Sequence, residues 1–355
     1  MKPYGGGEVG NRRTINLLKD LGYKVFLIPR YYTYKKKSIF IYLIMILGDF
    51  FSLLKLAIKL SYNKRHNSVV HIAGFTGQYL PYEFLSVLTA KVLGYKVIYE
   101  IRGGGIIGFF NNGNFIYKYL FKATIRIADT IFSQGLENKE LITGNSKSEF
   151  FYYPNYIENS FMPKKCPIKD TRSINLVYIG RLCPSKNIDI ILKAFNIIKQ
   201  HIANTSIHVI GDSEDYPEYV ISLKKYVRDM NLENSCHFYG KLDRTKIIQL
   251  LPSMHFFLFP TTEKREGQSN SLTETMSYGI IPISSSQGYS RRIINNDFLI
   301  EDTLTAEAYA KKIINIIETD QINCLSSSMY NRIKDNYLYD IIKLNVEKEY
   351  KKLFY

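Results

Sequence analysis

The stretch HFFLFPTTEKREGQSNSLTETMSYGIIPISS (255–285) holds two short apolar runs separated by a polar loop and a helical pattern. The runs at 255–260 and 280–285 are typical of buried strands, and 269–278 is typical of a helix. Two strands joined through a helix form a right-handed βαβ unit with both strands parallel in one sheet. The stretch therefore predicts a doubly wound α/β domain.

The same alternation runs through the second half of the chain. It predicts strands at 174–180, 207–211 and 236–240, with helices near 187–200, 217–230, 243–253, 305–318 and 326–353. We assign residues 171–335 to this second domain. The preceding segment 151–170 is rich in Pro, Asn and charge, and is typical of a linker.

The first half repeats the pattern less regularly, and we assign residues 1–160 to a first Rossmann-like domain. It predicts strands at 24–29, 69–75, 96–101 and 128–135, with helices near 9–21, 79–93 and 114–127. A length of 355 residues also favours two domains. The four cysteines (Cys166, Cys183, Cys236, Cys324) are scattered, so we expect free buried thiols in a reducing, cytoplasmic compartment.

Positive charge is concentrated near the N-terminus. Residues 1–66 contain 13 Lys and Arg against 3 Asp and Glu, a balance of +10 out of +15 for the chain. Within them, the segment 31–66 has an apolar run at 39–47 flanked by basic clusters. We expect a helix pair that either packs on the sheet as core or contacts an anionic membrane surface peripherally. A solvated basic face without a partner is the alternative.

Two motifs carry candidate chemistry in the second domain. Arg181 and Lys186 lie in the loop between a strand and a helix, where two cations can bind a diphosphate. Glu266, followed by Gly267, lies in the loop after the predicted strand 255–260. Glu274 would lie one turn into the following helix. Backbone amides of the first helical turn (Ser269, Asn270, Ser271, Leu272) would be unsatisfied donors facing the same crevice.

The motifs GRLCPSK (180–186), EGQSNSLTE (266–274) with SYGIIPI (277–283), and PNYIENSF (154–161) resemble the retaining nucleotide-sugar glycosyltransferases of family 4 (group 1). The resemblance implies a GT-B fold of two Rossmann-like domains facing across a cleft. It also implies that Arg181 and Lys186 bind the donor diphosphate, that Glu266 contacts the donor sugar, and that Glu274 binds the ribose. Gly211, Asp212 and Gly240 would lie near the base, and a final helix, 336–355, would pack back on the first domain.

In this architecture the chemistry needs no metal and no cofactor, because cations and helix amides stabilise the leaving nucleotide diphosphate. The loop with Asp212, Glu214 and Asp215 follows a strand, but a solvated loop is the simpler interpretation. With retention of configuration, the donor phosphate oxygen would take the acceptor proton. We therefore assign no side-chain base.

The first domain departs from the family at the end of the strand 96–101. Relatives carry a histidine there, and this chain has Arg102. We hypothesise that Arg102 contacts an anionic donor or acceptor group, with a structural Arg as the alternative. His71 is more typical of a packed strand residue than of a catalyst.

In the family that the chain resembles, a glycine-rich turn follows the first strand and faces the cleft. The glycines near the N-terminus fit that turn, so the resemblance implies that Gly6 and Gly7 are donor-binding residues. That first strand would have to precede Met1, and we expect a truncated gene model.

These features together favour a hexosyltransferase-type enzyme. It would transfer sugar from a UDP- or GDP-sugar to a glycan or lipid-linked acceptor, as in capsule or O-antigen assembly. Alternatives are an inactive or truncated relative that binds only nucleotide or membrane, and an epimerase or phosphorylase of the same fold. A nucleic-acid-binding protein would also explain the basic pI, but the charge flanks an apolar run instead of alternating with exposed aromatics.

Overall fold

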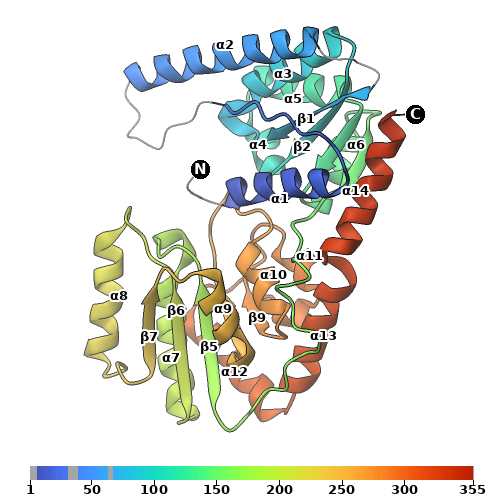
Figure 1. Cartoon of the computed structure of the whole chain (residues 1–355). Helices are drawn as coiled ribbons and strands as arrows, with labels where there is room; N and C mark the ends of the chain where they lie inside the picture. Colours follow the sequence, from blue (N-terminus) through green and yellow to red (C-terminus); the bar gives the residue numbers. More distant parts are fainter. Residues whose placement is uncertain (1–5, 31–38, 63–66, 355) are drawn as a thin grey trace. The chain divides into compact units, whose positions relative to one another are not determined.

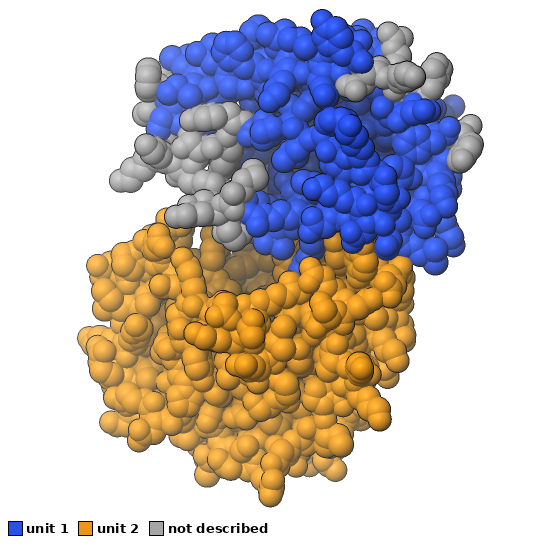
Figure 2. Space-filling view, viewed as in Figure 1, with its two compact units in different colours: residues 1–154, 343–355 blue, residues 155–342 orange. Residues whose placement is uncertain are grey.

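The computed structural model describes residues 6–30, 39–62 and 67–354. The chain divides into two compact units (Figure 2). Unit 1 comprises residues 1–154 and 343–355, and unit 2 comprises residues 155–342.

Unit 1 contains a four-stranded parallel sheet in the order β1-β2-β3-β4 (Figure 1). Its strands are β1 (Val69–Gly74), β2 (Lys96–Ile101), β3 (Thr130–Ser133) and β4 (Glu149–Tyr152). Its helices are α1 (Gly6–Asp20), α2 (Ile39–Ser61), α3 (Leu80–Val92), α4 (Ile106–Asn112), α5 (Phe115–Ile127), α6 (Lys139–Thr143) and most of α14 (Tyr339–Phe354).

The two faces of this sheet differ in chemistry because strand side chains alternate. On one face Val97 and Tyr99 of β2 join an apolar core with Val87 of α3 and Phe121 of α5. On the other face Glu100, which follows Tyr99 in β2, is buried in a polar network with helices α1 and α14. Strand β2 is therefore mostly apolar but contains one buried carboxylate, that of Glu100.

The prediction of a buried strand at 24–29 is wrong. Residues 23–30 have no regular secondary structure, and Phe26 and Leu27 are 54% and 56% exposed. A strand needs a neighbour for its ladder hydrogen bonds, and among the described strands β1 pairs with β2 alone. Residues 1–5, next to the expected first strand, lie outside the described residues.

The basic segment 31–66 forms one continuous helix where it is described, and not the expected pair. Helix α2 packs beside α3, and the Ser52 hydroxyl lies 2.8 Å from the Tyr82 hydroxyl. None of the helices in the described part of the chain is long and apolar enough to cross a membrane.

Unit 2 contains a five-stranded parallel sheet in the order β7-β6-β5-β8-β9. Its strands are β5 (Ile174–Ile179), β6 (Thr205–Ile210), β7 (Cys236–Gly240), β8 (Phe256–Phe259) and β9 (Ile281–Ser284). Its helices are α7 (Ile188–His201), α8 (Pro217–Asp229), α9 (Arg244–Leu250), α10 (Asn270–Met276), α11 (Ser290–Ile294), α12 (Ala306–Glu318) and α13 (Ile322–Asn336).

The predicted last helix, 326–353, is two helices, α13 and α14. The break at 337–338 has a backbone cause: the Ile157 N–H donates to Tyr337 O at 2.8 Å, and the Tyr339 N–H donates to Ile157 O at 2.9 Å. These bonds draw the chain out of the helical path. All four cysteines are free, but Cys324 is exposed, which corrects the expectation that every thiol is buried.

Candidate active site

The order of strands in unit 2 places a topological switch point between β5 and β8. From β5 the chain proceeds to β6 and β7 on one side, and then returns to β8 and β9 on the other. Loops at the carboxyl ends of such a pair diverge and leave a crevice for ligand. The two loops here are 180–187 after β5 and 260–269 after β8, which carry the predicted motifs.

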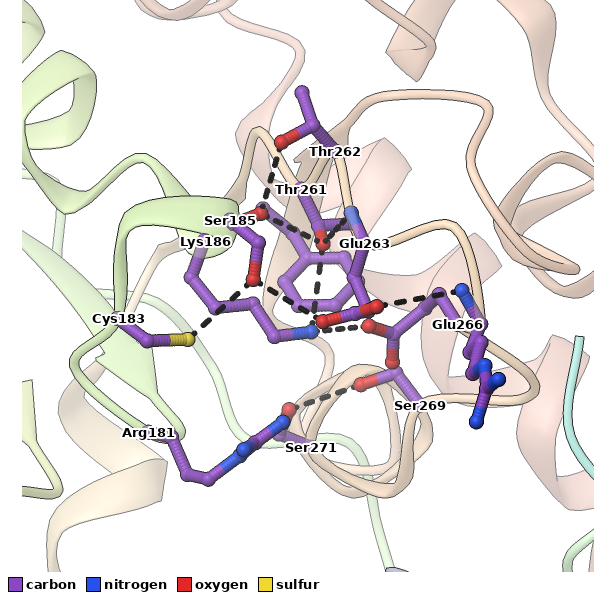
Figure 3. A network of polar contacts seen from close by, with 12 residues as sticks. Arg181, Cys183, Ser185, Lys186, Thr261, Thr262, Glu263, Glu266, Ser269 and Ser271 are labelled. Atoms are coloured by element: carbon purple, nitrogen blue, oxygen red, sulfur yellow. Dashed lines mark hydrogen bonds and ion pairs between the residues drawn. The ribbon is translucent and has the colours of Figure 1, made fainter. Parts of the chain in front are cut away.

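The loop after β5 presents its two cations differently. Lys186 ends a 3-10 turn (Pro184–Lys186) and is buried, whereas Arg181 is exposed. The buried Tyr178 hydroxyl donates to Arg181 O at 2.8 Å and so fixes the start of the loop. Figure 3 shows the Arg181 side chain extending from the loop that carries Lys186.

Lys186 and Glu266 form a buried ion pair across the switch point (Figure 3). Their side chains are only 9% and 13% exposed. The Lys186 ammonium also lies 3.4 Å from Thr261 Oγ1 and 4.9 Å from the centre of the Phe259 ring. A charge pair held in such a place is expensive to desolvate, which is typical of a functional site.

Hydrogen bonds join the two loops beyond this pair. Ser185 O accepts from the Thr262 N–H at 2.8 Å and from Thr261 Oγ1 at 3.3 Å, while Ser185 Oγ donates to Glu263 at 3.2 Å (Figure 3). No role was predicted from the sequence for Ser185, Thr261 or Glu263. The only signal was their position beside the predicted cation and carboxylate.

The first turn of α10 is partly satisfied by the protein itself. Ser269 is the N-cap residue, and its hydroxyl accepts from the Leu272 N–H at 3.3 Å. The prediction of an unsatisfied Leu272 amide is therefore wrong, for the reason that serine is a favoured N-cap. Ser271 lies 3.0 Å from Ser269 through their hydroxyls, and Glu274 lies one turn into the helix as expected.

A set of hydrogen bonds that we call the clasp holds Gln268 to the linker. The Asn155 N–H donates to Gln268 Oε1 at 2.6 Å, and Gln268 Nε2 donates to Asn155 O at 2.9 Å. The Asn155 amide also donates to Gln268 O at 3.2 Å and to Asn270 Oδ1 at 3.1 Å. Since Gln268 is buried two residues after Glu266, the clasp fixes the loop that carries this carboxylate.

Gly211 and Gly240 lie at the carboxyl edge of the sheet, as expected. The Gly211 N–H donates to Gly240 O at 2.8 Å. A Cβ at Gly211 would lie 1.8 Å from Gly180 O, so only glycine allows this approach. Asp212, Glu214 and Asp215 are exposed in the following loop, and Lys241 pairs with Glu214.

Gly288 is a further residue of the site that the sequence analysis missed. It has a φ of +64°, and a Cβ there would lie 2.7 Å from Glu266 O and 2.6 Å from Gly267 O. The loop before α11 therefore packs directly against the backbone of Glu266.

In unit 1, Arg102 is buried and bonded to the protein. It donates to both oxygens of Glu100, at 2.7 and 2.9 Å, to Thr14 Oγ1 at 2.6 Å, and to Gly7 O at 3.4 Å. Burial alone would raise the pKa of Glu100, but Arg102 and His71 lower it below the ordinary value. These partners correspond to a structural Arg, so contact with an anionic substrate stays a prediction.

His71 belongs to the same network. Its Nε2 lies 2.9 Å from Glu100 Oε2, and its Nδ1 lies 2.5 Å from the Tyr350 hydroxyl of α14. Gly6 and Gly7 are the first residues of α1, so they do not form the expected turn before the helix. A Cβ at Gly7 would meet the Phe75 ring at 2.7 Å.

In the part of the chain that the structure describes, no three His, Cys, Asp or Glu side chains come together as metal ligands. The predicted charged groups at the switch point are one carboxylate, Glu266, and two cations, Lys186 and Arg181, with the Glu263 carboxylate bonded to Ser185 beside them. Such a set suits an anionic ligand that also carries hydroxyl groups.

Known proteins share the fold of the whole chain. HepE of Anabaena, solved in complex with UDP, matches with a TM-score of 0.72 at 13% identity over 99% of this chain and 98% of that one. A glycosyltransferase of Rickettsia africae matches with a TM-score of 0.70 at 17% identity over 98% and 95% of the two chains. The chain therefore has the GT-B fold, as predicted.

Sequence comparison agrees for unit 2. Residues 162–336 match the model of glycosyl transferases group 1. An uncharacterized glycosyltransferase of Methanocaldococcus jannaschii is 30% identical over 203 residues, which are 56% of this chain and 49% of that one. The chain spans at most about half of the length of the curated relatives that it matches. Residues 162–336 are thus similar to the glycosyl transferases group 1 family, in agreement with the motifs.

Proposed function

We propose that the protein is a retaining hexosyltransferase of family 4, which transfers a sugar from a nucleoside-diphosphate sugar to a glycan or lipid-linked acceptor. The observation that carries the proposal is the buried Lys186–Glu266 pair at the switch point of the family-matched unit. The bound UDP in the structure of HepE supports UDP as the first donor nucleotide to test, with GDP as the second.

Lys186 and Arg181 would bind the donor diphosphate. Glu266 forms an ion pair with the Lys186 ammonium. A diphosphate would offer this cation a second anionic partner, while the exposed Arg181 would close on it with bidentate hydrogen bonds. Both cations would then stabilise the negative charge that develops on the leaving nucleotide, without a metal.

Glu266 and Glu274 would bind hydroxyl groups of the donor. A carboxylate accepts two hydrogen bonds strongly and so suits the paired hydroxyls of a sugar or a ribose. Glu266 would take the sugar and Glu274 the ribose, with Gly267, Asn270 and Ser271 beside them. Gly211, which follows β6, and Gly240, which ends β7, would leave room near the base.

Transfer with retention requires that the acceptor attack on the face from which the nucleotide leaves. We propose that a donor phosphate oxygen accepts the acceptor proton on that face, so that no side-chain base is needed. A poly(glycerol-phosphate) alpha-glucosyltransferase of Bacillus subtilis is 24% identical over 230 residues, 62% of this chain and 32% of that one. The name of this relative gives a polymer, poly(glycerol-phosphate), as its acceptor. For this chain we propose an acceptor in surface polysaccharide assembly, such as capsule or O-antigen, at the inner face of the cytoplasmic membrane.

The test begins with donor binding. The full chain is melted with UDP-, GDP-, ADP- and CMP-sugars, and a ligand at about 100 times its Kd should raise the stability by about 2.7 kcal/mol. The responding donor is then incubated with acceptors, and NMR of the product assigns the anomeric configuration. An inverted product would contradict retention, and a donor that binds without transfer to any acceptor would favour an inactive relative.

A further inference from the structure

Helix α2 presents an apolar face to solvent instead of a polar one. Four of its side chains are buried and form a stripe that faces the rest of unit 1: Met45, Ser52, Leu56 and Leu60. On the opposite side large apolar side chains are 46–63% exposed: Leu43, Ile46, Leu47, Phe50, Phe51, Leu54 and Ile58. We call these seven residues the outer face of α2. A surface helix of a globular unit ordinarily carries charged and polar residues there.

The acidic residue of α2, Asp49, does not contribute negative charge to the outer face. Asp49 is the only acidic residue between 39 and 61. Both of its oxygens accept from Arg30, at 2.6 Å from Nε and 2.5 Å from Nη2, and its side chain is 19% exposed. Arg30 is stacked in turn on Tyr79 and Tyr82. The pair therefore leaves the outer face without net negative charge.

Positively charged residues occur on α2 and, in the sequence, on both sides of it. Lys55 is exposed on α2, and the ammonium groups of Lys59 and Lys24 lie 4.2 and 5.1 Å from the centre of the exposed Phe26 ring. In the sequence the helix is preceded by Lys35, Lys36 and Lys37 and followed by Lys64 and Arg65. Residues 31–66 thus hold 7 Lys and Arg against 1 Asp, a balance of +6.

We propose that the outer face of α2 is the surface by which the protein binds an anionic lipid membrane, with the helix axis in the plane of the interface. A helix of 23 residues is about 34 Å long, so its whole outer face can enter the boundary between headgroups and acyl chains. The lysines at its rim would contact the phosphate groups of the lipids while their alkyl chains lie along the apolar surface. In Figure 1 the helix lies along α3.

The charge around the face favours lipid over a second copy of the chain. Two such surfaces would bring like charges together, which opposes self-association. An anionic membrane satisfies both components, because it accepts apolar side chains and attracts cations. The inference deepens the proposed membrane association and does not depend on the sugar-transfer reaction.

The absence of tryptophan from the sequence makes a direct test possible. Phe50→Trp places a single reporter on the outer face, and Ile221→Trp places one at an apolar residue of α8 that is equally exposed, at 57% against 59%. Both full-length variants are titrated with phosphatidylcholine vesicles, with and without phosphatidylglycerol. We expect a blue shift and quenching by brominated lipid for Phe50→Trp, with phosphatidylglycerol present, and neither for Ile221→Trp.

A flotation assay gives the energetic contribution of the face. Leu47→Gln, Phe50→Gln and Leu54→Gln are exposed substitutions, and each should weaken binding to phosphatidylglycerol vesicles about tenfold. Lys55→Glu should weaken it as well, and added salt should reduce that effect. Ile221→Gln is the matched control. The donor-induced rise in Tm should be unchanged in all of them, which separates this inference from the proposed reaction.

Two outcomes would overturn the inference. One is vesicle binding that the glutamine variants do not change. The other is self-association of the wild type that Phe50→Gln abolishes in sedimentation, with no binding to vesicles, because the face would then bind a second copy.

Discussion

At the scale of single residues, the unit 2 site depends on a cation and a carboxylate that are buried together. Replacing Lys186 by Met would remove the positive charge and leave Glu266 buried without its partner. We expect kcat/KM for donor to fall by about 10²-fold or more, because the cation stabilises the leaving group. Steady-state kinetics measure this, and Lys264→Met, an exposed lysine two residues before Glu266, is the control. An unchanged kcat/KM in Lys186→Met would remove this residue from the reaction.

Gly288 tests whether the position of the Glu266 backbone matters. Gly288→Ala would place a methyl group 2.7 Å from Glu266 O and force the loop to move. Gly22→Ala is matched in backbone strain, with a φ of +86°, but no atom lies within 4 Å of its Cβ. Both variants should lose about 1–2 kcal/mol of stability from the positive φ. Only Gly288→Ala should also lose activity, measured as kcat/KM for donor.

His255 makes the stability of unit 2 depend on pH. Burial and the nearby Lys169 lower the pKa of His255 to about 4, and its Nδ1 accepts from the Asn175 N–H at 3.1 Å. Below a pH of about 6.5 the unfolded chain binds this proton and the folded chain does not, so unfolding becomes easier as the pH falls from about 6.5 to 4.

Denaturant unfolding followed by circular dichroism should show this dependence, and His255→Gln should make it smaller. It should not abolish it, because burial and His237 also lower the pKa of His208 to about 4. The exposed His201 is the control, and His201→Gln should leave the pH dependence unchanged. If the free energy of unfolding depended on pH equally in His255→Gln and in the wild type, folding would not lower the pKa of His255.

At the scale of elements, the clasp links the start of unit 2 to the loop that carries Glu266. Asn155→Ala and Gln268→Ala each break hydrogen bonds of this link, so each should lower kcat/KM for donor by about tenfold. Because the two residues act as a unit, the double variant should fall little below the single ones, with a coupling energy close to the roughly 1.4 kcal/mol that a tenfold loss represents. Asn159→Ala is the control, since its amide bonds Asp340 outside the site. Additive effects would contradict a shared role.

The sequence predicted elements well where several signals agreed. The run 96–101 is β2 at the same bounds, because an apolar stretch between turn residues has a partner on each side. The run 24–29 is also mostly apolar but has no pairing strand among the described residues, so it stays irregular. Composition indicates that a segment can form a strand, while the neighbours decide whether it does.

Candidate site residues follow the same division. Lys186 and Glu266 could be predicted, because each follows a strand end and their chemistry fits an anion and a sugar. Gln268, Asn155 and Gly288 could not, since their roles depend on loops that meet only in the folded unit. For Arg102, the sequence did not predict the contacts that this residue makes within the protein. Its position at a strand end, where relatives carry a histidine, led to the hypothesis of a substrate contact, and nothing in the sequence revealed that Glu100, two residues earlier, would bind it.

At the scale of the whole molecule, unit 1 is completed by a segment from the far end of the chain. Helix α14 contributes Tyr350, which is 4% exposed and lies 6.1 Å from Phe132 between ring centres. Tyr350→Phe removes the bond to His71 and should destabilise unit 1 by about 1 kcal/mol.

Hydrogen exchange can assign this loss to unit 1. In Tyr350→Phe we expect faster exchange of amides in β1 and β2 and unchanged exchange in β5 and β6. Leu344→Ala on the same helix is the control, because that side chain is 52% exposed. Faster exchange in both units would mean that Tyr350 stabilises more than its own unit.

The bond between His71 and Tyr350 joins residues 279 positions apart, and this has a consequence for biosynthesis. Residues 155–342 are translated between the two parts of unit 1. At a ribosomal rate of about 5–20 residues per second, the first part waits about 10–40 s for α14. During that interval the buried Glu100 and His71 lack the Tyr350 side of their network, while unit 2 can already fold. Unit 1 is thus the first to begin synthesis and the last to be completed. In a nascent chain its N-terminal part would therefore stay exposed to chaperones the longest.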